Sequence, residues 1–148
     1  MTKTTTLAVL RLLRVQAALE ARFTAALGSV HGLALNELLL LMNLDRAPLG
    51  RMRRVDLAAA LTMSQSSVTR MAMPLEKVGL VARAADPRDG RVGYVALTDA
   101  GRARVREAEA TLDRLTEAAF ADRWSAEEVE ALSALLGRLA APLPGHLG

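Results

Sequence analysis

Residues 55–102 constrain the fold of this chain more than any other part of its sequence. They contain the signals for two short helices, of which the first begins at Asp56 and the second can be capped by Ser64. Two extended segments follow, Val81–Ala84 and Arg91–Leu97, and the turn sequence DPRDGR joins them. Two short helices followed by a β-hairpin are the parts of a winged helix-turn-helix. We therefore expect a mainly α fold with a small β wing.

The second of these helices has a polar outer face. Val68, Met71 and Leu75 recur at intervals of three and four residues, which predicts that they point inward. Gly79 suits the end of the helix because it tolerates positive φ, and Leu80 can then fold back on Leu75 as in a Schellman motif. A recognition helix presents its base-reading side chains on the outer face near its N-terminus. In this helix those positions hold Gln65, Ser66, Thr69 and Arg70.

The hairpin tip places charged side chains on an exposed loop. Pro87 presets the turn and Gly90 relaxes it, so Arg88, Asp89 and Arg91 lie together. An acidic residue two positions before an arginine can hold its guanidinium through a bidentate pair. We expect Asp89 to brace Arg91 in this way, an orientation that suits a narrow DNA minor groove. Taken alone, the tip also fits a solvated hairpin with incidental charges.

Charge is distributed unevenly along the chain. Residues 1–50 hold five basic and three acidic side chains (+2), residues 51–106 eleven and five (+6), and residues 107–148 three and eight (−5). A basic centre followed by an acidic end indicates that the middle meets phosphates. The sequence has no cysteine, which excludes disulfides, thiolate metal sites and thiol redox sensing. The start MTKTTT lacks the features of a signal peptide, and no run approaches the roughly 20 apolar residues of a membrane span, so we expect a soluble cytoplasmic protein.

The region before the central segment predicts two helices. Residues 5–27 carry an apolar stripe at helical spacing, with arginines elsewhere on the helix. Gly28 and Gly32 bracket a turn, and NELLLLMNL then predicts a second helix that is apolar on nearly every side and therefore buried. A loop from Asp45 to Gly50 leads into the centre.

The region after the central segment predicts two more helices. Thr98 can cap a helix that begins at Asp99, and Ser125 with Glu128 forms a capping box for the last one. Long terminal helices with apolar stripes usually pack on each other, and a second copy of so short a chain could supply much of the packing. Before Pro142 ends it, the last helix is expected to bury Val129, Leu132, Leu135 or Leu136, and Leu139.

Five motifs occur in order along the centre. They are L-A-x-x-L from Leu57, S-x-S-x-V-T-R from Ser64, L-E-x-x-G-L-V from Leu75, D-P-R-D-x-R from Asp86 and L-T-x-x-G-R from Leu97. In order and spacing they resemble the MarR (multiple antibiotic resistance regulator) family of bacterial transcription factors. The flanking helices fit that family's layout of six helices and a wing, so the resemblance covers nearly the whole chain.

The resemblance implies a homodimeric DNA-binding regulator, a repressor that a small-molecule effector releases from a pseudo-palindromic operator in double-stranded DNA. Its first and last helices would intertwine with those of a second copy. The three parts of the resulting domain would be a dimerisation helix with the buried second helix (1–46), the winged helix-turn-helix lobe (47–102) and the C-terminal dimerisation helices (103–148). In addition to the base-reading residues and the wing pair, we expect contacts with DNA phosphates from Arg53, Arg54, Ser64, Ser67 and Arg88.

The resemblance also implies an effector pocket between the first two helices, the fifth helix and the DNA-binding lobe. Its polar candidates are Arg14, His31, Asn36 and Asn43. The chain has one Trp, one Tyr and two Phe, so a small aromatic or amphipathic effector would meet mainly aliphatic walls. We expect no cofactor and no metal. His31 and His146 are too few and too far apart for a zinc site, and no base lies near Ser64, so the sequence does not predict an enzyme.

Three residues depart from the family pattern. Thr62 replaces a frequent glycine in the turn between the two helices, which is costly for a β-branched residue if φ is positive. Ala34 stands where Ser or Thr commonly caps the second helix, a loss of about 1 kcal/mol unless Asn36 caps it. Pro74 lies inside the recognition helix and removes an amide that would bond the carbonyl of Arg70, at roughly 3 kcal/mol. These departures leave open an alternative, a winged-helix dimer that acts as an interaction module without specific DNA binding.

Overall fold

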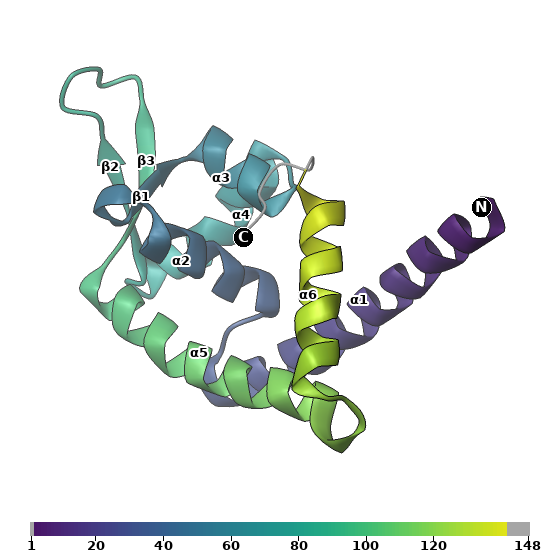
Figure 1. Cartoon of the computed structure of the whole chain (residues 1–148). Helices are drawn as coiled ribbons and strands as arrows, with labels where there is room; N and C mark the ends of the chain where they lie inside the picture. The colour runs from purple at the N-terminus through teal and green to yellow at the C-terminus, as the bar shows by residue number, and fades with distance from the viewer. Residues whose placement is uncertain (1, 142–148) are drawn as a thin grey trace.

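The computed structural model describes residues 2–141, so His146 and the helix stop at Pro142 lie outside the described residues. Six helices, two short 3-10 turns and three strands make up this part of the chain (Figure 1). They are α1 (Thr2–His31), α2 (Leu35–Arg46), η1 (Pro48–Gly50), β1 (Arg51–Arg53), α3 (Arg54–Leu61), α4 (Gln65–Lys77), β2 (Val81–Ala85), β3 (Gly93–Leu97), α5 (Asp99–Phe120), η2 (Ala121–Arg123) and α6 (Ala126–Ala140). The predicted fold, mainly helical with a small β wing, is confirmed.

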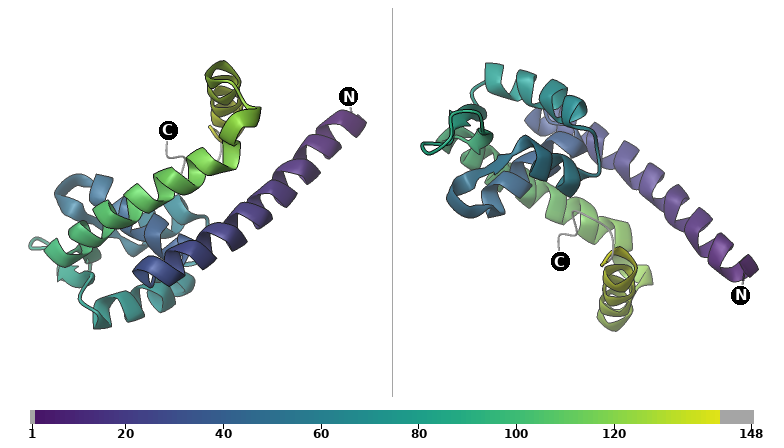
Figure 2. Two further views of the ribbon diagram at one scale, coloured as in Figure 1. Left: turned by 90° about the horizontal axis from the view of Figure 1, so that it is seen from below. Right: turned by 90° about the horizontal axis from the view of Figure 1, so that it is seen from above.

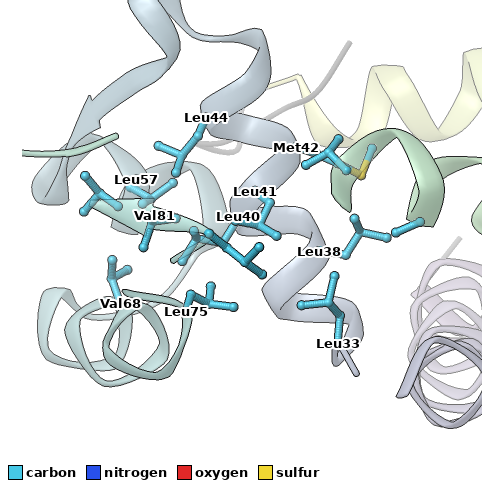
Figure 3. Close-up of a cluster of buried hydrophobic side chains, with 14 of the residues drawn as sticks. Leu33, Leu38, Leu40, Leu41, Met42, Leu44, Leu57, Val68, Leu75 and Val81 are labelled. Carbon is cyan, nitrogen blue, oxygen red and sulfur yellow. The ribbon is translucent and has the colours of Figure 1, made fainter. Parts of the chain in front are cut away.

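Helix α2 forms the centre of the core. Leu38, Leu40 and Leu41 are fully buried, and apolar side chains from α3, α4 and β2 pack around the helix, Leu57 and Val68 among them (Figure 3). Burial on nearly every side of α2 was predicted from its sequence, and it is confirmed. Within residues 2–141, no single helix is long and apolar enough to cross a membrane; α1 and α2 meet that test only as a pair bent by 75°.

The ends of α2 and of α1 differ from the prediction. Helix α1 runs through Gly28 to His31, and only Gly32, at φ 67°, makes the turn. Asn36 does not cap α2, because the helix already begins at Leu35. The missing hydroxyl of Ala34 is compensated from two sides. The amide of Leu35 donates to Thr24 Oγ1 of α1 (3.2 Å), and the amide of Ala34 donates to Glu37 Oε1 (2.8 Å).

The capping interactions that the sequence predicts are present at both ends of α4. Ser64 caps α4 by accepting from the amide of Ser67 at 3.1 Å. At the other end, the amide of Leu80 donates to the carbonyl of Leu75 (2.9 Å) beyond a Gly79 at φ 77°, which confirms the Schellman motif. Between the helices, Thr62 has φ 53° and ψ 49°, the left-handed conformation that costs a non-glycine residue about 1–2 kcal/mol.

Strand β1 was not predicted, because three residues with two arginines carry no strand pattern of their own. It pairs with β3, as Arg51 with Ala96, and β2 pairs with the opposite edge of β3 to give an antiparallel sheet of order β1-β3-β2. Beyond the β1 partner Tyr94, the β2–β3 hairpin projects from the body (Figure 1). Strand β3 begins at Gly93 and not at Arg91, since the amide of Asp86 donates to the carbonyl of Val92 and closes the turn there.

Of four further helix boundaries, two differ from the prediction and two agree with it. Helix α3 begins at Arg54, two residues before the predicted Asp56, and α2 extends to Arg46 into the predicted loop. The predicted caps of the last two helices are confirmed. The amide of Gly101 donates to Thr98 Oγ1 at 3.0 Å, and both hydrogen bonds of the Ser125 capping box are present.

Two terminal segments lie outside the core of the single chain. No residue of α6 is buried, so the predicted burial of its leucines is wrong within one chain; Leu135 is 58% and Leu139 55% exposed. The first half of α1 extends away from the body, and Leu10 and Leu13 are 54% and 57% exposed (Figure 2). Trp124 packs edge-on against Phe120, with ring centroids 5.5 Å apart.

The backbone is closely packed where the wing ends and α5 begins. The hydroxyl of Thr98 donates to the carbonyl of Gly79 at 2.6 Å, and its amide donates to the carbonyl of Leu80 at 3.1 Å. Gly101, in the first turn of α5, lies directly against the same backbone. A Cβ at this position would overlap the carbonyl oxygen of Leu80 and lie 2.6 Å from Leu97 Cδ1.

We therefore predict that Gly101→Ala lowers the free energy of unfolding by roughly 3 kcal/mol or more, because backbone must move to admit the methyl group. Thermal unfolding would show a melting temperature lower by about 2–4 °C per kcal/mol. Gly28→Ala is the matched control, since nothing lies within 4 Å of a Cβ built there. That control should stabilise the helix by roughly 0.5–1 kcal/mol. Equal stability of the two variants would contradict the packing argument.

Candidate nucleic-acid interface

The N-terminal half of α4 presents polar side chains to solvent. Gln65, Ser66 and Arg70 are exposed and Thr69 is half-buried, while Val68 on the opposite face is fully buried. This face therefore has the polarity that the sequence predicts for a recognition helix. The helix N-terminus also carries unpaired amides and the positive end of the helix dipole, which favour anions.

Hydrogen bonds fix the side chains at this end of α4. Ser64 Oγ lies 2.9 Å from Ser67 Oγ and 3.1 Å from Ser66 Oγ. The guanidinium of Arg70 donates to Ser67 Oγ at 3.2 Å. The three serines and Arg70 thus form one connected group that is exposed along its outer side.

The start of α3 adds two exposed arginines beside α4. Arg54 donates to Thr69 Oγ1 at 3.4 Å and so reaches across to the recognition helix. Arg53 instead pairs with Asp56, with Nε 2.9 Å from the carboxylate, and this hydrogen bond and charge raise the pKa of Arg53. Asp56 was not predicted as a partner from the sequence, and it offsets the charge of one of the three arginines that were predicted to bind phosphate.

At the wing tip Asp89 holds the guanidinium of Arg91, although the side chain of Arg91 remains in solvent. Asp89 accepts from Arg91 Nε at 3.1 Å, from a terminal guanidinium nitrogen at 3.3 Å and from the backbone amide at 3.0 Å. These bonds lower the pKa of Asp89. The side chain of Arg91 is nonetheless 92% exposed. Arg88 is also exposed on this loop.

Asp86 and Tyr94 shape the wing tip, and the sequence analysis missed both. Asp86 Oδ1 accepts from the amide of Arg88 at 2.7 Å, and Asp86 Oδ2 accepts from the hydroxyl of Tyr94 at 3.0 Å. The two bonds, the first being the larger cause, lower the pKa of Asp86. The guanidinium of Arg51 lies 4.4 Å from the centre of the Tyr94 ring, a cation–π contact. The first aspartate of D-P-R-D was the available signal, because Asp commonly accepts from the amide two residues on.

A groove of about 460 Å³ separates α4 from the wing. Arg54 and Thr69 line one side of it and Arg91 the other, while Glu76 and Arg83 form an ion pair of 3.3 Å on its lining. The structure thus brings together predicted site residues from α3, α4 and the wing. An arrangement of exposed arginines, hydroxyls and a helix N-terminus around one groove is suited to a polyanion.

The four predicted effector residues do not meet. His31 lies against α5, with Nε2 2.7 Å from Thr111 Oγ1, and borders a cavity of about 210 Å³ that reaches Pro74 of α4. Asn43 is buried two turns further along α2 than Asn36 and donates to the carbonyl of Leu39. Arg14 is exposed on the projecting half of α1, 17 residues and so about 25 Å along the helix from His31.

Comparison with known proteins connects this geometry to a family. The family model described as "MarR family" matches residues 33–92. The uncharacterized HTH-type transcriptional regulator YxaD of Bacillus subtilis is 32% identical over 102 residues, which are 68% of this chain and 68% of that protein. The uncharacterized HTH-type transcriptional regulator YdgJ of the same organism is 34% identical over 84 residues. This match covers 57% of this chain and about half (51%) of the length of YdgJ.

A solved structure extends the similarity to nearly the whole chain. The MarR family transcriptional regulator Sco3205 from Streptomyces coelicolor, crystallised in complex with DNA, superposes with a TM-score of 0.82. The two proteins are 25% identical, and the superposition covers 95% of this chain and 88% of that one.

The wing contacts lead to a prediction about Asp86. A carboxylate with a lowered pKa orders the loop above its unfolded pKa, and that order is lost as the pH falls through the folded pKa. Tyr94→Phe keeps the ring under Arg51 and removes one hydrogen bond, so the pKa of Asp86 should rise and the loop should loosen at a higher pH. Carboxyl-carbon NMR titration measures this change. An unchanged Asp86 titration would refute the role of the hydroxyl.

Proposed function

The chain belongs to the MarR family of transcriptional regulators, and from this premise we propose that it is a homodimeric repressor which a small-molecule effector releases from its operator. The observation that carries the proposal is the groove between α4 and the wing, where Arg54, Thr69 and the braced Arg91 converge. The family is one of regulators and not of enzymes. A regulator of this kind acts where the DNA is, in the cytoplasm.

In the proposed complex, α4 enters the major groove, which is wide enough for an α-helix. Gln65, Ser66, Thr69 and Arg70 would face the base edges, because they occupy the exposed side of its first turns. Arginine donates two hydrogen bonds to guanine, and glutamine both donates to adenine and accepts from it, so Arg70 and Gln65 are the stronger candidates for sequence readout.

The wing would enter the neighbouring minor groove. Asp89 already orients the exposed guanidinium of Arg91, so less side-chain freedom is lost when that group enters a narrow groove. Arg54 and Arg88 would contact phosphates on either side of this insertion. Ser64 and Ser67 lie at the N-terminus of α4, where phosphates are favoured. Arg53 would contribute less than Arg54, since Asp56 already pairs with it.

The exposed apolar segments support a homodimer. The single chain leaves many leucines and valines of its two terminal helices in water, which monomeric proteins rarely do. In α1 these are Leu7, Val9, Leu10, Leu12, Leu13 and Val15, and in α6 they are Leu135, Leu136 and Leu139. We assign residues 1–46 and 103–148 to dimerisation and residues 47–102 to DNA. Two-fold symmetry then requires a pseudo-palindromic operator with half-sites about 10 base pairs apart.

The cavity beside His31 is the best-supported place for the effector. It lies between the end of α1, α5 and the recognition helix, with Arg104 and Pro74 on its lining. A small aromatic or amphipathic molecule that enlarged it would push on α4 directly. Of the four residues proposed from the sequence, His31 alone borders this cavity; Asn43 borders a different hollow.

The alternative, a winged-helix dimer without specific DNA binding, has less support. It depended on Pro74 disrupting the recognition helix, and α4 is continuous from Gln65 to Lys77. The polar face of α4 precedes Pro74 and keeps its hydrogen bonds.

The proposal predicts that Arg91→Ala weakens operator binding by roughly tenfold, about 1.4 kcal/mol, because one minor-groove contact is lost. A salt-titrated gel shift on the promoter region of the protein's own gene measures it. Wild-type protein should show a steep salt dependence and a large preference over unrelated DNA. Arg123→Ala, in η2 at the far end of α5, is the charge-matched control. Affinity unchanged within about twofold would remove the wing from the mechanism.

A second prediction tests the dimer. Leu10→Glu together with Leu13→Glu should convert the protein from a species of twice 15.8 kDa to a monomer, because both side chains are more than half exposed in one chain and would be covered by the second. Sedimentation velocity gives the masses. Val55→Glu changes an exposed apolar residue (48%) of the DNA-binding lobe and should leave the dimer intact. A monomeric wild-type protein would overturn this assignment.

A further inference from the structure

A second hollow lies at the base of the wing, on the β1 side. We call it the β1 hollow; it measures about 560 Å³ and is lined by the end of α2, η1, β1 and Tyr94. Because β1 and β2 pair with opposite edges of β3, this hollow and the groove beside α4 flank the wing. Each is lined by three arginines and one carboxylate, a net charge of +2 on either side.

Within residues 2–141, two of the three arginines of the β1 hollow form no ion pair. Arg53 pairs with Asp56, which leaves Arg46 and Arg51. Arg46 is exposed, and among residues 2–141 it forms no hydrogen bond or ion pair through its side chain. Arg51 is held over the ring of Tyr94, whose hydroxyl in turn holds the wing through Asp86. The hollow therefore presents one adaptable and one fixed guanidinium.

The rim of the hollow carries an unusual leucine. Leu49 has φ 60° and ψ 14°, a left-handed conformation that costs a leucine about 1–2 kcal/mol. Its side chain is 84% exposed, so packing within the chain does not offset that cost. A strained residue that holds an apolar side chain in water is a feature found at binding sites.

The geometry of a minor groove explains this arrangement. A hairpin inserted into the groove has one DNA backbone on each side. One DNA backbone would lie in the protein groove between α4 and the wing. The other backbone must then pass along the β1 side of the wing. We propose that the β1 hollow binds this second backbone, with Arg46 and Arg51 on consecutive phosphates and Leu49 against a deoxyribose. The inference rests on the proposed insertion of the wing.

The arginines are tested with the full-length dimer and the operator fragment. Each lost phosphate contact lowers the slope of log affinity against log salt by about 1, so Arg46→Gln and Arg51→Gln should each do so. Arg51→Lys keeps the charge and should keep the slope, which separates phosphate binding from the stacking on Tyr94. Arg123→Gln is the control and should match the wild type.

Modified operators locate the contact. Single methylphosphonates, which carry no charge, are placed along the strand that lies across the minor groove from α4. Neutralising the contacted phosphate should weaken wild-type binding, and it should weaken Arg46→Gln much less, since that variant has already lost the partner. If the affinity loss caused by Arg46→Gln and the affinity loss caused by the methylphosphonate multiply at every position, the proposal is overturned.

Leu49→Asn separates binding from folding. Asparagine accepts the left-handed conformation more readily than leucine, so the melting temperature should be equal or higher. Operator affinity should nonetheless fall, because the apolar contact is lost; full affinity would remove Leu49 from the site.

The outcomes distinguish this inference from the proposed function. If Arg46→Gln and Arg51→Gln keep the wild-type salt slope while Arg91→Ala loses affinity, the wing binds DNA and the β1 hollow does not. If Arg91→Ala also keeps full affinity, wing insertion fails and this inference fails with it.

Discussion

The backbone contact between Gly101 and Leu80 is the constraint on which the rest of the structure depends. It lies where the chain leaves α4, and where it returns from the wing to begin α5. Thr98 completes the junction, because its hydroxyl donates to the carbonyls of Gly79 and Leu80, just beyond the end of α4, and accepts from the amide of Gly101. The recognition helix, both wing strands and the long helix α5 therefore meet at one point. A side chain at Gly101 would separate all four.

From this junction, α5 connects the DNA-binding lobe to the helices assigned to dimerisation. Arg102 pairs with Asp45 of α2 at 3.2 Å, and Arg104 donates to the carbonyl of His31 at the end of α1. These contacts lie within the first two turns of α5, so the orientation of α4 is fixed relative to the end of α1. The cavity beside His31 is lined both by Arg104 of α5 and by Pro74 of α4. A molecule bound there would therefore press directly on the recognition helix.

Features that depend on neighbours in sequence were predictable, and those that join distant residues were not. The caps at Ser64, Thr98 and Ser125 and the Asp89–Arg91 pair each involve residues two or three apart. Strand β1 exists only because β3 lies 40 residues further on, and Tyr94 reaches Asp86 only once the turn has formed. The prediction that the leucines of α6 are buried was wrong for another reason. Their periodicity indicates an apolar face, but it does not indicate which chain covers that face.

Pro74 illustrates how a costly residue can be accommodated at a useful position. It is exposed, so the carbonyl of Arg70 that lacks its helical donor can be hydrated, and the helix continues to Lys77 without it. The turns of α4 that are proposed to read bases lie before this point, and the Schellman closure lies after it. The proline therefore leaves α4 with its weakest hydrogen bonding between the face that would read DNA and the end anchored at Leu80. Since the same residue borders the cavity beside His31, an effector there would act on α4 where the helix resists bending least.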